Sequence, residues 1–161
     1  MREKEDIKRG QERLEAHAEK TFTENNVNQR ELINGMMKME IGGCSYEEKS
    51  LTFAFPVQQW QANRAGTLHG GIICTAFDIT ASALARFFAG ENFAPTVSLD
   101  VKYVRPAKVG DRLLVTARAT ASGKRITQLT CEAYSKDSGK LVATGASVFL
   151  NVDTMKEKAQ K

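Results

Sequence analysis

Residues 69–88 read HGGIICTAFDITASALARFF, and this stretch decides the fold of the chain. Its apolar residues cover so many sides of a helix that the pattern predicts a long, largely buried helix from about Gly70 to Phe88. Asp78 places a carboxylate in the middle of this helix. Because burying an unpaired carboxylate is costly, Asp78 is expected to be hydrogen-bonded, paired across an interface, or positioned for chemistry.

The helix begins at a glycine pair, Gly70 and Gly71, directly after His69. A helix N-terminus presents free N–H groups and the positive end of the helix dipole, so this start favours the chemical role for Asp78. A rise of about 1.5 Å per residue separates Gly70 from Asp78 by roughly 12 Å. If both act on one atom, they must come from two antiparallel copies of the helix, which predicts a symmetric homodimer with composite active sites.

Length and composition indicate one globular domain with a polar extension. The chain has 161 residues, of which 42% are hydrophobic, enough for one sizeable core. Apolar runs are broken well before about 18 positions, and the N-terminus is densely charged. We therefore expect no membrane span, no signal peptide and a cytoplasmic location.

The three cysteines, Cys44, Cys74 and Cys131, are far apart and form no CxxC pair. This spacing argues against a disulfide framework and against a thiolate metal site. They are predicted to be small buried residues, and no metal is expected.

The net charge of +4 is unevenly distributed. Residues 102–125 carry seven basic side chains and one acidic side chain, Asp111. This local excess suits a ligand that bears phosphate groups, although the same residues could simply be the solvated positions of two strands and their turns. Nucleic acid is not expected as a partner, because no recognition-helix pattern or aromatic and basic interleaving is present.

Residues 1–30 are rich in charge, with sparse apolar positions at Ile7, Leu14 and Ala18. The pattern predicts a charged helix with a thin apolar seam. It could dock on the domain, but a solvated extension is the favoured interpretation, and His17 is expected at the surface. A short helix should follow, with an apolar stripe that packs on the core and consists of Leu32, Ile33, Met36 and Met37.

Six strands are predicted around the long helix. Two lie at 39–44 and 50–57, and four at 96–105, 112–121, 125–134 and 141–151, separated by turns rich in Gly, Asp and Ser. The segment 58–68 has no clear period and is predicted to be a loop with one helical turn. The order of elements predicts an α+β fold in which the helix lies across the concave face of an antiparallel sheet.

The chain resembles the hotdog-fold acyl-CoA thioesterases, in the branch of the phenylacetate-pathway (PaaI-like) thioesterases. The resemblance covers residues 31–149. It implies a central helix wrapped by a curved antiparallel sheet of about five to six strands, a hotdog domain at 31–153 after the N-terminal extension 1–30, and a polar tail at 154–161. The motifs that carry it are Asn63-x5-His69-Gly70-Gly71, Asp78 in the central helix, Tyr103-x-Arg105-Pro106-Ala107 and Gly110-Asp111.

The resemblance implies roles for the residues around the helix start. The Gly70 N–H would be the main oxyanion donor to a thioester carbonyl, and Gly71 would serve the helix start and close packing beside the substrate. Asn63 would bind the thioester or the attacking water with its amide, where a loop Asn would otherwise be a turn residue. His69 would polarise the carbonyl or, as we favour, hold the loop that bears Asn63. Asp78 would act from the partner protomer as a general base or as a nucleophile.

The resemblance also implies roles further from the helix. Ser98 would help to orient the water, although its alternation with Leu99 places it on the solvated face together with Asp100. Contacts to the coenzyme A phosphates are expected from the basic excess, at Arg105, Lys124 and Arg125.

The implied function is hydrolysis of an acyl or aryl-acyl thioester of coenzyme A, or of an acyl carrier protein, to a free acid and a thiol. Coenzyme A would enter as part of the substrate, with no other cofactor and no membrane partner, and the dimer could pair again into a homotetramer. Two alternatives remain: a hotdog hydratase acting on acyl thioesters, and a non-catalytic acyl-CoA sensor with residues 1–30 as its output element.

Overall fold

The computed structural model describes residues 2–90 and 92–152, so the predicted tail at 154–161 lies outside the described residues. The elements follow the predicted order closely, and the loop before the long helix holds the single helical turn expected of it. In chain order they are α1 (Arg2–Thr23), the π-helical turn η1 (Glu24–Asn28), α2 (Ile33–Met36), β1 (Glu40–Ser45), β2 (Ser50–Pro56), the 3-10 turn η2 (Gln59–Gln61), α3 (Gly70–Phe88), β3 (Thr96–Tyr103), β4 (Arg112–Ser122), β5 (Ile126–Ser135) and β6 (Leu141–Leu150).

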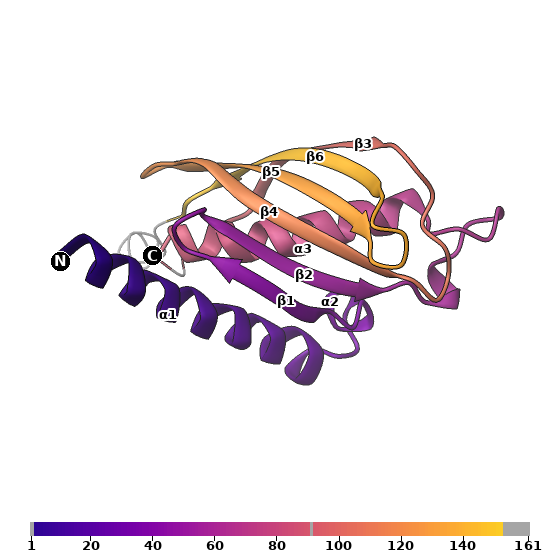
Figure 1. The fold of residues 1–161 in the computed structure, drawn as a ribbon, viewed down its shortest axis with the longest axis horizontal. Coiled ribbons are helices and arrows are strands. Elements are labelled where there is room, and N and C mark those ends of the chain that lie inside the picture. Colours follow the sequence, from indigo (N-terminus) through magenta and orange to yellow (C-terminus); the bar gives the residue numbers. More distant parts are fainter. Residues whose placement is uncertain (1, 91, 153–161) are drawn as a thin grey trace, which may run out of the picture.

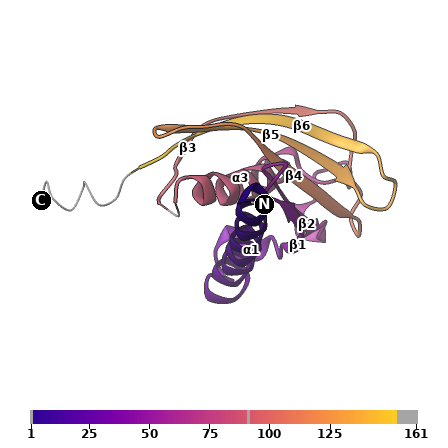
Figure 2. The same cartoon turned by 60° about the vertical axis from the view of Figure 1, so that its left-hand side comes forward.

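The strands form one antiparallel sheet in the order β1-β2-β4-β5-β6-β3. The sheet curves over α3, which runs along its concave face (Figure 1 and Figure 2). This is the predicted α+β arrangement of a central helix wrapped by a sheet, with an extra N-terminal helix. The two edges of the sheet are β1 and β3.

The core forms between α3 and the inner face of the sheet. Phe77 and Leu84 of α3 are fully buried, as are Phe53 of β2 and Val115 of β4. By length and composition alone α3 could span a membrane. However, 56% of its most apolar 18-residue stretch is buried inside the fold. More than half of this helix is therefore packed inside the fold, chiefly against the sheet.

The N-terminal helix α1 is docked, so the interpretation of residues 1–30 as a solvated extension is wrong. Leu14 and Ala18 are buried, and His17, which was expected at the surface, is only 2% exposed. His17 Nε2 donates to the Ala83 carbonyl of α3 at 2.8 Å, and the His17 ring packs against Phe87. A thin seam of apolar residues suffices because the helix rests on the fold along that one line.

Side chains of α1 also reach the outer edge of β1, beside which α1 lies in Figure 1. Gln11 Nε2 donates to the Cys44 carbonyl at 3.1 Å, and Gln11 Oε1 accepts from the Tyr46 N–H at 2.8 Å. Gly10 is required at the contact because a Cβ there would collide with the Tyr46 ring. The β1 edge is thus covered by α1 and hydrogen-bonded through Gln11.

Candidate active site

The first turn of α3 leaves one backbone donor open. His69 is the N-cap, and its Nδ1 accepts from the Gly71 N–H at 3.0 Å. Its carbonyl accepts from the Ile72 N–H at 2.9 Å. Within residues 2–90 and 92–152, the Gly70 N–H has no acceptor. The sequence therefore leaves the Gly70 N–H free at the positive end of a long helix, where an oxyanion would be stabilised.

Asn63 lies in the loop before α3 and holds that loop in a turn. Its Oδ1 accepts from the backbone N–H groups of Ala65 at 2.9 Å and Thr67 at 3.2 Å, and its Nδ2 lies 3.0 Å from Thr67 Oγ1. Asn63 therefore has the structural role of an ordinary turn asparagine in this structure. Asn63 also lines a cavity of about 330 Å³ together with Gly70 and Arg105, which brings three predicted site residues to one place.

Tyr103, at the end of β3, forms the wall of this cavity next to Gly70. Its hydroxyl donates to the Gly70 carbonyl at 3.1 Å and lies 3.1 Å from Cys74 Sγ. The hydrogen bond with Cys74, followed by burial, raises the pKa of Tyr103 to about 12. A Cβ at position 70 would lie 3.1 Å from the Tyr103 ring, so the close approach of the ring favours glycine there.

Sequence reasoning did not assign Tyr103 or Cys74 to the site. The alternation along β3 was the available signal, because it places Tyr103 on the same face as Leu99 and Val101, which pack against the core. The cysteine prediction holds for Cys131 alone, since Cys44 and Cys74 are only half-buried.

Asp78 lies two turns further along α3 and is half-buried, which is less than its apolar neighbours in sequence suggested. The adjacent residues Phe77 and Ile79 are buried. Asp78 Oδ1 accepts a hydrogen bond from Thr96 Oγ1 at 2.6 Å. Burial and, secondly, the negative charge of Asp78 raise the pKa of Cys131 on β5 to about 12. The carboxylate therefore lies at the inner side of the sheet but keeps access to solvent.

Ser98 is exposed on β3, and the structure does not bring it to Asp78. Thr96 pairs with Phe149 and Ser98 pairs with Val148, so the register shifts at Val97. This bulge changes the alternation of side chains along the strand. Thr96 consequently reaches Asp78, while Ser98 keeps the parity of Asp100, an exposed residue. The catalytic role of Ser98 stays a prediction.

The predicted phosphate contacts lie at opposite ends of α3. Arg105 lines the Gly70 cavity and donates to the Leu141 carbonyl at 3.1 Å. Lys124 and Arg125 line a separate cavity of about 510 Å³ beside Phe88, where α3 ends. In one chain these two places cannot contact the same phosphate group, since a helix of 19 residues spans roughly 28 Å.

Much of the remaining basic excess is used in surface ion pairs. Arg112 pairs with Glu40 on β1 at 3.0 Å, and Arg118 pairs with Glu48 at 2.8 Å. The solvated-strand interpretation therefore accounts for these two cations. Metal ligands do not gather in the part of the chain that the structure describes: no three His, Cys, Asp or Glu side chains there could hold an ion.

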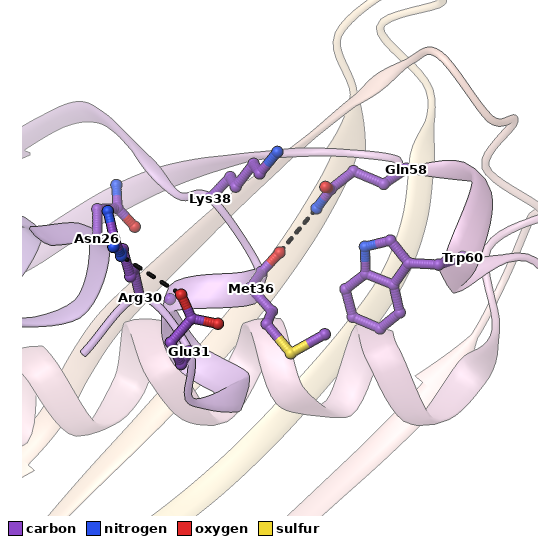
Figure 3. A pocket seen from close by; sticks show the side chains of 8 residues that line it. Asn26, Arg30, Glu31, Met36, Lys38, Gln58 and Trp60 are labelled. Atoms are coloured by element: carbon purple, nitrogen blue, oxygen red, sulfur yellow. Dashed lines mark hydrogen bonds and ion pairs between the residues drawn. The ribbon is translucent and has the colours of Figure 1, made fainter.

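A third cavity, of about 530 Å³, lies between α2 and η2 and contains none of the predicted site residues. Figure 3 shows the Trp60 indole beside Met36, with the Gln58 amide bonded to the Met36 carbonyl at 2.8 Å. The expected packing of the α2 stripe on the core is wrong for most of its members. Met37 alone is buried, whereas Leu32, Ile33 and Met36 are exposed.

Comparisons with known proteins all identify thioesterases as the relatives of this chain. The model of the thioesterase superfamily matches residues 65–142. Acyl-coenzyme A thioesterase 13 of Mus musculus is 33% identical over 129 residues, which cover 73% of this chain and 90% of that protein. The human protein of the same name is 37% identical over 92 residues, which cover 55% of this chain and 64% of that protein.

Solved structures with the same fold include two that are under 25% identical and so bear on the fold alone. The zebrafish thioesterase superfamily member 2 has a TM-score of 0.70 at 22% identity, covering 83% of this chain and 94% of that chain. A variant of the phenylacetic acid degradation protein PaaI from Thermus thermophilus has a TM-score of 0.64 at 20% identity, covering 73% of this chain and 96% of that chain.

Proposed function

The chain is a thioester hydrolase that belongs to the thioesterase superfamily, and we propose that it is a PaaI-like member that hydrolyses acyl thioesters of coenzyme A. The name of the mouse relative, which aligns over most of its length, supports this substrate class. The products are a free acid and coenzyme A.

The observation that carries the proposal is the free N–H of Gly70, a residue that lines one cavity together with Asn63 and Arg105. When water attacks the thioester carbon, negative charge develops on the carbonyl oxygen before the C–S bond breaks and the thiol leaves. A backbone donor at a helix N-terminus stabilises that charge without having to reorganise. Arg105 lines the same cavity, where a guanidinium can bind a phosphate of coenzyme A.

Asp78 is the proposed catalytic carboxylate, acting on water as a general base or on the thioester as a nucleophile. Within one chain it lies about 12 Å along the helix axis from Gly70, which is too far for both to contact one carbonyl group. The reaction therefore requires Gly70 from one protomer and Asp78 from another. His69 holds the helix start through its bond to the Gly71 N–H.

The free edge of the sheet supports a homodimer. Among the described strands β3 pairs only with β6, and it exposes Val97 at 62%, Tyr103 at 56% and Val104, just beyond its end, at 46%. Antiparallel pairing of two β3 edges would cover these side chains and place the two α3 helices antiparallel. An unpaired apolar edge of this kind is a ready site for pairing with another chain.

The testing experiment measures thiol release from a panel of short, long and aryl acyl-CoA esters by the wild-type chain and by Asp78→Asn. We expect turnover by the wild type and a loss of about 100-fold or more in the variant, with ester binding kept, because general acid–base groups contribute about that much. Binding without turnover by the wild type on every ester would overturn the proposal and favour an acyl-CoA sensor.

A further inference from the structure

The strand β3 places a hydroxyl directly on the proposed catalytic carboxylate. Thr96 Oγ1 donates to Asp78 Oδ1 at 2.6 Å. We propose that Thr96 is a positioning residue that fixes the orientation of the Asp78 carboxylate and leaves Oδ2 to act on the water or the thioester. This inference rests on the proposed role of Asp78 and adds a residue that acts through it.

Both partners of the hydrogen bond are attached to fixed parts of the fold. The Thr96 backbone pairs with Phe149 of β6, and the preceding Pro95 carbonyl accepts from the Leu150 N–H at 3.0 Å. Asp78 is carried by the middle of α3 and is flanked there by buried neighbours. A donor anchored in this way can hold a carboxylate in one rotamer, which a water molecule in its place would not do.

The bulge at Val97 is what makes the contact possible. With regular alternation, Thr96 would share the face of Ser98 and Asp100, and the Asp100 side chain is exposed to solvent. The one extra residue turns the Thr96 side chain toward α3 instead. Bulges commonly redirect a side chain next to a functional site in this way.

The bond uses one carboxylate oxygen and leaves the other available. In the described part of the chain, Thr96 is the one side chain that donates to the Asp78 carboxylate. Without it the carboxylate can rotate about its side-chain bonds, so a smaller fraction of molecules has an oxygen aimed at the reacting atom. The loss should appear in kcat, because the orientation matters in the reacting complex and substrate binding does not use Thr96.

The experiment compares Thr96→Val, which removes the hydroxyl at nearly constant shape, with Thr96→Ser, which keeps it. Thiol release from an acyl-CoA ester is measured for both, alone and combined with Asp78→Asn. Thr130→Val, at an exposed threonine of β5, is the matched control. We expect Thr96→Val to lower kcat roughly tenfold with KM unchanged, since a hydrogen bond to a charged group is lost, and Thr96→Ser to restore kcat.

In the Asp78→Asn background, Thr96→Val should have no further effect on the residual rate, because the two residues act as one unit. Wild-type kinetics in Thr96→Val, or no rescue by Thr96→Ser, would overturn the inference alone, provided that Asp78→Asn itself lowers turnover by about 100-fold or more. Full turnover by Asp78→Asn would instead overturn the proposed function, and the positioning role with it. A lower Tm for Thr96→Val without a change in kcat would show a purely structural contact and also overturns the inference.

Discussion

The Tyr103 hydroxyl at the end of β3 donates to the Gly70 carbonyl at the start of α3, at 3.1 Å. Near the other end of the same strand, Thr96 donates to Asp78. The edge strand therefore contacts the central helix at both positions where the proposed chemistry takes place. The spacing of Gly70 and Asp78 is set by the helix, and their attachment to the sheet is set by β3.

Gly70→Ala tests the close approach at the helix start. A Cβ would lie 3.1 Å from the Tyr103 ring, so the ring or the helix start must shift while the helix gains roughly 1 kcal/mol of propensity. We expect kcat/KM to fall by about tenfold or more, because the oxyanion donor is displaced, with little change in Tm. The assay is thiol release together with thermal unfolding. Gly123→Ala is the control, since a Cβ there meets only the Ile126 carbonyl at 3.7 Å; unchanged kcat/KM in Gly70→Ala would contradict the oxyanion role.

Arg105→Ala tests phosphate recognition in the Gly70 cavity. We expect kcat/KM for a coenzyme A ester to fall roughly tenfold, the value of one charge-assisted hydrogen bond. A short thioester that lacks the nucleotide should be hydrolysed as fast as by the wild type. Lys108→Ala, at an exposed lysine three residues along that does not line the cavity, is the control. Equal losses for both substrates would mean that Arg105 acts on the fold rather than on the phosphates.

Val97→Lys tests the proposed dimer edge. A lysine at this position would bury an ammonium group in the apolar pairing of two edges, so we expect the variant to sediment as a monomer and to lose turnover, because Gly70 and Asp78 of different chains no longer meet. Thr130→Lys, on an exposed position of β5, should keep both the dimer and the activity. A monomeric variant with wild-type turnover would show that one chain contains a complete site.

Leu14→Ala tests the docking of α1. The side chain is fully buried, and large-to-small changes at such positions cost about 2–5 kcal/mol. We expect the free energy of unfolding in urea to fall by that amount, whereas Arg9→Ala, an exposed position on the same helix, should change it little. Equal urea midpoints for Leu14→Ala and the wild type would mean that the docking of α1 does not contribute to the free energy of unfolding.

Cys131→Ala tests a pH effect in the core. Burial, and then the charge of Asp78, raises the pKa of the Cys131 thiol from about 9 to about 12 in the folded chain. The folded state therefore holds the proton more tightly, so this stabilising contribution is complete below pH 9 and is lost as pH rises toward 12.

Above pH 9 the wild-type free energy of unfolding should consequently fall more steeply than that of Cys131→Ala, by about 1.4 kcal/mol per pH unit at most. Urea titrations at several pH values measure the difference. Val115→Ala removes buried volume from β4 without removing an ionisable group, and it should keep the wild-type slope. Parallel curves for wild type and Cys131→Ala would contradict the raised pKa.

The fold could be predicted from the sequence because its signals are local. Turn residues separate the strands, and the apolar run at 69–88 has the density of a buried helix, so β1 to β6 and α3 were confirmed within a few residues. The docking of α1 could not be predicted in the same way. Its seam of Leu14 and Ala18 is too thin to distinguish a helix that rests on the fold from a solvated one.

The sequence pointed to Gly70 and Asp78 because the residue type itself carries the proposed chemistry there, and their catalytic roles stay predictions. Thr96 was missed because its contact depends on register. A single bulge at Val97 decides which face of β3 Thr96 occupies, and no alternation of residue types marks a bulge. Tyr103 follows the regular alternation of Leu99 and Val101, but its contact with Gly70 depends on how β3 lies against α3. For Asn63 the sequence was compatible with a turn residue and with a ligand-binding amide, and the structure shows the turn.

The covered β1 edge limits how far the sheet can grow. Gln11 occupies the carbonyl of Cys44 and the N–H of Tyr46 on that side, so another strand would have to displace α1 before it could add there. A chain with two open edges can polymerise into a fibre, whereas a chain with one can join only once. Assembly through sheet edges should therefore stop at a closed pair, and loss of α1 docking should produce open-ended aggregates rather than monomers.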